Sequence, residues 1–456
     1  LDLWVGSFRQ VFSRQATFHW FVIVIFGFML RIEGEGLTSI IRCLGLAPND
    51  YYNLLHFFHS SAFALSPLCR HWLALVFQVA PVLTVKDRPV YVFDAIKVGK
   101  TGKRMPGVKM LHQESGDNTK PEFIMGHFWG ALGLLCGSGE NVCAVPLLLK
   151  LQDGLKRSPS EKATLTDKMA QLVVESGVQA GLVVADSYYS CQAVLRGLLA
   201  AGFHYLGAVR QNTVAYHLPP PKEPHQPGRP RKYGEKVTLA KLFQQRELFT
   251  TARLSLYGKE QQVRLYAIDL LWQGFFVRFA LSVAETGRRG IFLCTDRTMT
   301  AEEIVSTYGM RFTIESGFKA LVYRLFAFCY RFWMRTMKKI KRGSGDQYLH
   351  RSGERYRKSV ERKVEAYERY VNLAAMAMGM LELLSLTVSP LAFRLGGLYF
   401  RTSLVSSQPT VYGVRLCLQG EVIRVFRRNE QSSLLAKILS ERERAAPCDH
   451  PYRLAS

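Results

Sequence analysis

The stretch between Val90 and Val209 constrains the fold most, because apolar runs typical of strands alternate there with helical patterns. The runs rich in β-branched and aromatic residues predict strands at 90–98, 108–112, 144–151, 181–186 and 204–209. Helices are expected at 159–176, with Ser158 or Ser160 as the N-cap, and at 190–201. A series of strands and helices in this order predicts an α/β domain.

Two aspartates stand out in this stretch. Asp94 lies in the middle of VYVFDAIKVG (Val90–Gly99), a run that predicts a buried strand. A buried carboxylate is costly unless a cation or a metal ion accompanies it. Either the strand ends at Asp94 and its side chain faces solvent, or a cationic group lies beside it. Asp186 ends the apolar run GLVVAD, a position that is also common for an ordinary turn or cap residue.

The charge of the chain indicates its class of partner. Among 456 residues the net charge is +24, and 48% of the residues are hydrophobic, so the chain is expected to form two or three folded domains with cores. A folded protein this basic usually binds a polyanion, of which nucleic acid is the first candidate and a membrane surface the second. An inert basic surface is the remaining alternative.

Neither a membrane span nor a zinc site is predicted. The apolar run Phe18–Leu30 has 13 residues, fewer than the ~20 needed to cross a bilayer, so a buried core helix is expected. The nine cysteines include no CxxC pair and no Cys/His cluster with zinc-finger spacing. Scattered single cysteines suit a reducing cytoplasm.

The remaining segments predict three further regions. Residues 1 to about 80 read as helical, and within them Gly36–Ser60 forms either a helix-turn-helix or an ordinary pair of antiparallel helices. Short β segments at 251–257, 262–271 and 275–283 predict a β-rich insertion over 213–289. Helices are expected at 299–321 and 366–386, and strand-like pieces at 409–418 and 421–428.

The helix expected at 299–321 carries a third carboxylate. Thr300 is its expected N-cap with Glu303 as the capping-box partner. Further along, Tyr308, Arg311, Glu315 and Lys319 share one helix face. An ordinary Arg–Glu surface pair is the plain alternative, although arginine before glutamate is the poorer orientation for such a pair.

Asp94, Asp186 and Glu315 together form the set of ligands that a two-metal site needs. Three carboxylates can hold two Mg²⁺ ions about 3.5–4 Å apart, one activating the attacking oxygen and the other stabilising the leaving oxygen of a phosphodiester. Hard oxygen ligands favour Mg²⁺, and Mn²⁺ can substitute. An arginine and a tyrosine beside the glutamate can hold a phosphate near the scissile bond.

These residues resemble a known family. The spacing Y-x2-R-x3-E at Tyr308, Arg311 and Glu315 is similar to the signature helix of the DDE transposases of bacterial insertion sequences, in the broad insertion-sequence-four group. Asp94 in VFDAIKVGK and Asp186 in VVADSYYS match the two aspartates of that family. The segments LHQESGDNTKPEFIMGH and CTDRTMTAEEIVSTYGMRFTIESGFK also resemble it, and the resemblance spans about residues 10–385.

One position departs from the family pattern. A basic residue is expected seven positions after the glutamate, where this chain has Val322. Lys319 and Arg324 are the candidates to replace it.

The resemblance implies a fold and an activity. The fold would be an RNase H-like catalytic core interrupted by a β-rich insertion, with a helical N-terminal domain and a mostly helical C-terminal region. The activity would be cut-and-paste transposition, in which Asp94, Asp186 and Glu315 hold two Mg²⁺ ions, cut at the ends of a mobile element and join the 3′-OH ends to target DNA. The partners would be terminal inverted repeats and target DNA, bound by a homodimer in the bacterial cytoplasm, with no membrane. An RNase H-fold nuclease that cuts without joining, and a DNA-binding relative with an inactive core, are the alternatives.

A dense basic run is the second predicted DNA contact. Residues 331–363 contain 12 Lys and Arg against three acidic residues, with a cluster in MKKIKR. We expect this cluster to contact DNA phosphates. The predicted DNA-binding residues are Tyr308, Arg311, Lys319, Lys338, Lys339, Lys341 and Arg342. The predicted domains are a helical domain at 1–85 that is a candidate for binding DNA ends, the RNase H-like core at 86–212 and 290–345, the insertion at 213–289, and a basic, helical C-terminal region at 346–456.

Overall fold

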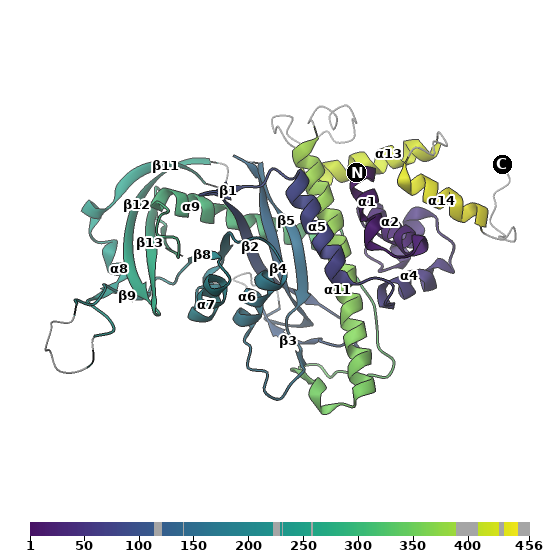
Figure 1. Ribbon diagram of the computed structural model, residues 1–456, viewed down its shortest axis with the longest axis horizontal. Coiled ribbons are helices and arrows are strands. Elements are labelled where there is room, and N and C mark those ends of the chain that lie inside the picture. Colours follow the sequence, from purple (N-terminus) through teal and green to yellow (C-terminus); the bar gives the residue numbers. More distant parts are fainter. Residues whose placement is uncertain are drawn as a thin grey trace. The chain divides into compact units, whose positions relative to one another are not determined.

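The computed structural model describes two compact units. The described residues are 1–113, 121–139, 141–221, 229, 231–256, 259–388, 409–427 and 433–445. One unit comprises Leu1–Val79, Lys319–Trp333 and Ser359–Ser456, and the other comprises Ala80–Phe318 and Met334–Lys358. The first unit is built from helices, and the second contains the large sheet (Figure 1).

The second unit has a mixed α/β fold, as predicted. Thirteen of its described strands form one sheet, in which β2 (Arg88–Gly99) is an interior strand. On one side β2 pairs antiparallel with β4 (Phe123–Ser138), which pairs in turn with β3 (Lys109–His112) and β5 (Asn141–Leu151). On the other side β2 pairs parallel with β7 (Leu182–Ala185), and β7 pairs parallel with β8 (His204–Ala208). All the strands expected between Val90 and Val209 are present.

The longest strand of this region, β4, was not predicted. Its inner residues are buried on both faces, so the alternation of polar and apolar residues that marks a half-exposed strand is missing. Its glycines also lower the strand propensity, although contacts require some of them. A Cβ added at Gly126 would lie 2.3 Å from the carbonyl oxygen of Val98, and one added at Gly130 would lie 2.6 Å from Sδ of Met169.

The strands after β8 extend the same sheet. β14 (Arg289–Cys294) pairs antiparallel with β8 and carries β13 (Phe275–Ala284) on its other edge. The strands beyond β13 are β12 (Lys259–Trp272), β11 (Thr250–Leu256), β9 (Val214–Tyr216) and β10 (Lys236–Thr238). Between β10 and β11 lie the short helices α8 (Leu239–Leu242) and η3 (Arg246–Leu248). Short strands expected in this region are therefore present, and they share the sheet of β2.

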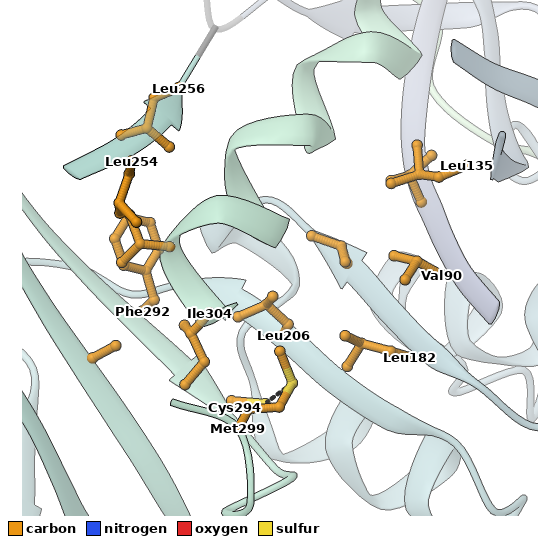
Figure 2. Close-up of a cluster of buried hydrophobic side chains, with 14 of the residues drawn as sticks. Val90, Leu135, Leu182, Leu206, Leu254, Leu256, Phe292, Cys294, Met299 and Ile304 are labelled. Atoms are coloured by element: carbon orange, nitrogen blue, oxygen red, sulfur yellow. Dashed lines mark hydrogen bonds between the residues drawn. The ribbon is translucent and has the colours of Figure 1, made fainter. Parts of the chain in front are cut away.

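A buried cluster links this extension to the rest of the sheet. It combines side chains from β2, β7, β8 and β14 with Met299 and with Ile304 of α9 (Ala301–Gly309). Figure 2 shows these side chains gathered between the strands and a helix. The α9 helix is therefore fixed on the sheet by its apolar face.

The helix predicted over 299–321 is interrupted. Thr300 and Glu303 form the predicted capping box, but α9 ends at Gly309. A 3₁₀ turn, η4 (Met310–Phe312), leads into α10 (Thr313–Tyr323). Glycine is a poor helix former, and the Thr313 hydroxyl donates to the carbonyl of Met310 at 2.8 Å, which favours a break here.

Helix α6 (Leu165–Glu175) begins six residues later than predicted. Its N-cap is Thr164, which accepts a hydrogen bond from the Asp167 backbone while the Asp167 carboxylate accepts one from the Thr164 backbone. The predicted caps Ser158 and Ser160 instead hydrogen-bond to each other. The next helices are η2 (Ser187–Tyr189) and α7 (Gln192–Ala200).

The first unit is helical in its described residues. Its N-terminal helices are α1 (Asp2–Ser7), η1 (Phe8–Val11), α2 (Gln15–Leu30), α3 (Thr38–Leu44), α4 (Asp50–His59) and α5 (Leu65–Val79). The apolar run at 18–30 lies in α2 and is almost entirely buried, as expected for a core helix. Helix α11 (Glu354–Thr387) begins before the predicted start at 366. By length and composition α11 could cross a membrane, but 89% of its apolar window is buried inside the protein, as in the core helix of a soluble fold.

The strand-like pieces predicted near the C-terminus were wrong. Residues 411–427 form helix α13, and α14 (Leu434–Ala445) follows. Tertiary packing overrides the β propensity of this stretch, because Val414 is fully buried and the buried Arg415 guanidinium donates to the Met29 carbonyl at 2.8 Å.

Candidate active site

The sheet register brings Asp94 and Asp186 to the same level. Val92 of β2 pairs with Val184 of β7 in parallel. Asp94 and Asp186 each follow these partners by two residues, one in the continuing strand and one just after β7 ends at Ala185. Because the strands are parallel and adjacent, both carboxylates lie at the carboxyl end of β7.

Each aspartate is oriented by the backbone that follows it. The Ala95 N–H donates to Oδ1 of Asp94 at 2.7 Å, and the Ser187 N–H donates to Oδ1 of Asp186 at 2.7 Å. Asp186 is thereby the N-cap of η2, so the ordinary turn role also applies to it. In both residues the second carboxylate oxygen remains for other partners.

Arg311 links Asp94 to Glu315. Its Nη1 donates to Oδ2 of Asp94 at 3.3 Å, and its Nη2 donates to Oε1 of Glu315 at 2.7 Å. The Arg311 side chain is 14% exposed, that of Asp94 20% and that of Glu315 51%. The cation that the sequence requires beside Asp94 is therefore an arginine from η4, and Asp94 lies inside its strand rather than at its end.

The electrostatics show that the three carboxylates share one environment. Burial raises the pKa of Asp94 to about 6, the Ala95 N–H and Arg311 oppose this rise, and the charges of Asp186 and Glu315 add to it. Burial lowers the pKa of Arg311, but Tyr308, Glu315, Asp186 and Asp94 outweigh burial and raise that pKa overall. One guanidinium thus balances a cluster of three acidic groups.

The chemistry of this cluster suits a divalent cation, but the spacing does not present a ready site. Carboxylate oxygens are the ligands that Mg²⁺ prefers, and the excess negative charge requires a cation. Among the described residues, however, no three His, Cys, Asp or Glu side chains are placed to hold one metal ion. Arg311 contacts the carboxylates of Asp94 and Glu315, so a metal ion bound by these groups would have to displace its side chain.

The other predicted residues lie in three places. Tyr308 packs its ring on Phe292 of β14, with centroids 4.7 Å apart, and lies 5.8 Å from the Arg311 guanidinium carbon. Lys319 is exposed on α10, in a segment of the helical unit. Lys338, Lys339, Lys341 and Arg342 are exposed, and none of them contacts the three carboxylates.

Two aromatic residues beside the carboxylates were not predicted from the sequence. Tyr189 is buried and packs edge-on against Phe93, the neighbour of Asp94, with ring centroids 4.8 Å apart. Tyr188, 49% exposed, packs edge-on against Tyr189 at 5.1 Å. These edge-on contacts hold η2 against β2 and so position Asp186 relative to Asp94. The signal was the aromatic pair two and three residues after Asp186 in ADSYYS.

Comparison with known proteins gives a match over part of the chain. No curated protein matches. Among solved structures, the piggyBac transposase synaptic complex with hairpin DNA has 11% sequence identity and a TM-score of 0.37, covering 99% of this chain and 83% of that chain. Residues 152–266, which include Asp186 but neither Asp94 nor Glu315, match a family model described as DDE superfamily endonuclease. Over this region the chain is therefore similar to the DDE superfamily endonucleases.

Proposed function

We propose that the protein is a DDE transposase that cuts DNA at the ends of a mobile element and joins the 3′-OH ends to target DNA. The observation that carries the proposal is the cluster around Arg311. Asp94 and Glu315 hydrogen-bond to the Arg311 guanidinium, and Asp186, at the level of Asp94 on the adjacent parallel strand, interacts with it electrostatically. The match of residues 152–266 to a DDE superfamily endonuclease model supports the same conclusion.

The sheet topology also supports this proposal. In the order β5-β4-β2-β7-β8, the first three strands are antiparallel neighbours and the last two continue in parallel. This order is the one expected of the proposed RNase H-like core. The strands β9 to β13, between Asp186 and Glu315, would then be the β-rich insertion of this core.

Asp94, Asp186 and Glu315 would hold the metal. Bound Mg²⁺, or Mn²⁺, would activate the attacking oxygen and stabilise the leaving oxygen of the phosphodiester. The buried β2 strand and the edge-on ring contacts of Phe93, Tyr189 and Tyr188 keep the two aspartates in place. The Glu315 carboxylate, half-exposed on α10, is the ligand with most freedom to adjust.

Arg311 and Tyr308 would bind the DNA phosphate beside the scissile bond. An arginine guanidinium matches the two oxygens of a phosphate as well as it matches two carboxylates. We infer that Arg311 exchanges its carboxylate partners for a phosphate when DNA and metal enter. The further proposals are that the chain belongs to the insertion-sequence-four group, acts in the bacterial cytoplasm and assembles as a homodimer on inverted repeats, with the domain boundaries predicted above.

The experiment is a strand-transfer assay. The purified chain is incubated with Mg²⁺, a target plasmid and duplexes made from the DNA that flanks its gene. Asp94→Asn is the test variant. Asp87→Asn is the matched control. Asp87 is exposed in the turn that precedes β2, and its positive φ of 58° is one that asparagine tolerates.

We expect 3′ ends joined to the target plasmid with the wild type and with Asp87→Asn, and none with Asp94→Asn. Cleavage without joined product would indicate a nuclease without strand transfer. Binding without cleavage would indicate an inactive DNA-binding relative. Either outcome would overturn the proposal.

A further inference from the structure

The cluster MKKIKR belongs to a segment of turns and irregular structure that is held on the sheet unit by backbone hydrogen bonds. The Met334 N–H donates to the carbonyl of Arg104 at 2.9 Å, and the Ile340 N–H donates to the carbonyl of Lys103 at 2.7 Å. Beyond it, the Met110 N–H of β3 donates to the carbonyl of Ser344 at 2.8 Å. The two chain segments 103–104 and 334–344, far apart in sequence, are therefore neighbours.

A side chain strengthens this junction. The guanidinium of Arg104 donates through Nη1 to the carbonyl of Arg335 at 2.8 Å. On the far side, β15 (Gln347–Tyr348) pairs in parallel with β6 (Leu155–Lys156). The basic segment is thus fastened before, within and after its cluster of cations.

The segment directs its apolar side chains inward and its cations outward. Met334 and Met337 are 5% and 6% exposed, and Ile340 is half-buried, so every third residue packs against the protein. The residues between them are exposed. Together with the exposed Lys103 and the half-buried Arg104, they form a surface that we call the two-segment basic surface: Lys103, Arg104, Arg335, Lys338, Lys339, Lys341 and Arg342.

Carboxylates of the described residues do not neutralise this surface. Asp346, the acidic residue within 334–352, is held by Lys109 at 2.7 Å and by Lys156 at 3.9 Å. No ion pair joins a cation of the two-segment basic surface to a carboxylate in the part of the chain that the structure describes. Like charges repel, so a fold that fastens them together without counter-charges indicates an anionic partner.

The surface follows the strand that carries Asp94. The Lys100 N–H donates to the Met125 carbonyl at 2.8 Å, which extends the β2–β4 pairing beyond Gly99. Six residues of strand separate Asp94 from Lys100, a span of about 20 Å at ~3.3 Å per residue, and Lys103, the first residue of the surface, follows Lys100 by three residues. Along duplex DNA, 20 Å corresponds to about six base pairs.

We propose that the two-segment basic surface binds the phosphate backbone of a DNA duplex about six base pairs from the site of cleavage. This inference rests on the proposed function and adds Lys103, Arg104 and Arg335 to the residues that would contact DNA. A phosphate-rich membrane fits less well, because Met334 and Met337, the methionines among these cations, are buried and cannot enter a bilayer.

The test compares three double variants of the full chain. Lys103→Ala with Arg335→Ala removes one cation from each segment, and Lys338→Ala with Lys339→Ala removes two from one segment. Lys241→Ala with Arg246→Ala is the matched control, because it removes two exposed cations of the same unit that lie outside the basic run 331–363. Circular dichroism and thermal unfolding check that all three variants fold as the wild type does.

Binding to a DNA duplex of about 30 base pairs is measured by fluorescence anisotropy at several salt concentrations. Both surface variants should bind more weakly, and their log–log salt dependence should be shallower by up to ~1.8, or ~0.9 for each lost phosphate contact. The control should keep the wild-type slope. Parallel titrations use an RNA duplex of the same length and vesicles with anionic lipid. The surface variants should lose affinity for the DNA duplex.

A wild-type slope for Lys103→Ala with Arg335→Ala would overturn the two-segment surface, whatever the Lys338 and Lys339 variant does. A loss confined to RNA or to vesicles would overturn it in favour of that partner. Strand transfer by the wild type in the assay above would leave the proposed function intact in either case. A hydroxyl-radical footprint gives a second measurement: protection about six base pairs from the cut should disappear in the surface variants and persist in the control.

Discussion

Arg311 joins the strand that carries Asp94 to the helix that carries Glu315, with its Nη1 3.3 Å from Oδ2 of Asp94 and its Nη2 2.7 Å from Oε1 of Glu315. The same guanidinium interacts electrostatically with Asp186. The protein therefore supplies the positive charge of its own acidic cluster. A metal ion bound at these carboxylates would have to compete with this side chain.

This competition predicts the effect of removing the guanidinium. Arg311→Gln should bind Mn²⁺ more tightly than the wild type in the absence of DNA, because the metal no longer displaces a cation. At an effective dielectric constant of 20, two unit charges 4 Å apart interact by about 4 kcal/mol, so a gain of roughly tenfold or more is expected. Isothermal titration calorimetry with Mn²⁺ measures it.

Arg311→Lys is the control, because it keeps the charge and should keep weak Mn²⁺ binding. Equal or weaker Mn²⁺ binding by Arg311→Gln would show that the arginine does not compete with metal.

Asp94 should make stability depend on pH in metal-free buffer. Burial raises the pKa of Asp94 from 3.8 to about 6 in the folded protein. The folded state then binds more protons than the unfolded state between these values, so this contribution to stability falls as the pH rises from about 4 to about 6. Above pH 6, ionised Asp94 lowers the free energy of unfolding by roughly 3 kcal/mol.

Asp94→Asn removes this titration. Relative to the wild type, its free energy of unfolding should rise by up to roughly 3 kcal/mol between pH 4 and pH 7.5, as measured by urea unfolding in EDTA. Asp87→Asn provides the baseline. A difference between Asp94→Asn and the wild type that stays constant with pH would mean that Asp94 titrates normally.

Where β2 pairs with β4, an alanine substitution should destabilise the protein at one glycine and be tolerated at the glycine paired with it. Gly126 pairs with Gly99, and a Cβ at Gly126 would lie 2.3 Å from the Val98 carbonyl oxygen, whereas nothing lies within 4 Å of a Cβ at Gly99. Gly126→Ala should cost about 1–3 kcal/mol, the range typical of overpacking. Gly99→Ala should be nearly neutral. Urea unfolding of both variants checks this, and equal midpoints would rule out the close approach.

The sequence predicted the parts of the fold whose patterns are local. The strand around Asp94, the strand before Asp186 and the Thr300–Glu303 capping box follow from residue type and spacing. Strand β4 was missed because burial on both faces removes its alternation. The C-terminal strands were wrong because packing around Val414 and Arg415 decides the structure of that stretch.

For the candidate site, the sequence predicted which side chains to consider but not the contacts between them. The face shared by Arg311 and Glu315 was visible as a four-residue spacing, and the structure pairs them across the turn at η4. The contact between Arg311 and Asp94 depends on how η4 lies against β2, which no local pattern encodes. The pairing of 103–104 with 334–340 was hidden for the same reason.

We propose that Asp94, Asp186 and Glu315 form one metal-dependent site for cutting DNA. The most direct measurement is Mg²⁺-dependent cleavage of the flanking-DNA duplexes by Asp94→Ala, Asp186→Ala and Glu315→Ala, with DNA binding measured on the same preparations. Each variant should lose cleavage while it retains affinity close to that of the wild type, because metal ligands serve the chemistry and phosphate contacts serve the affinity. Substantial cleavage by any one of the three variants would contradict the proposed three-carboxylate site, because the residue changed in that variant would not be needed for cleavage.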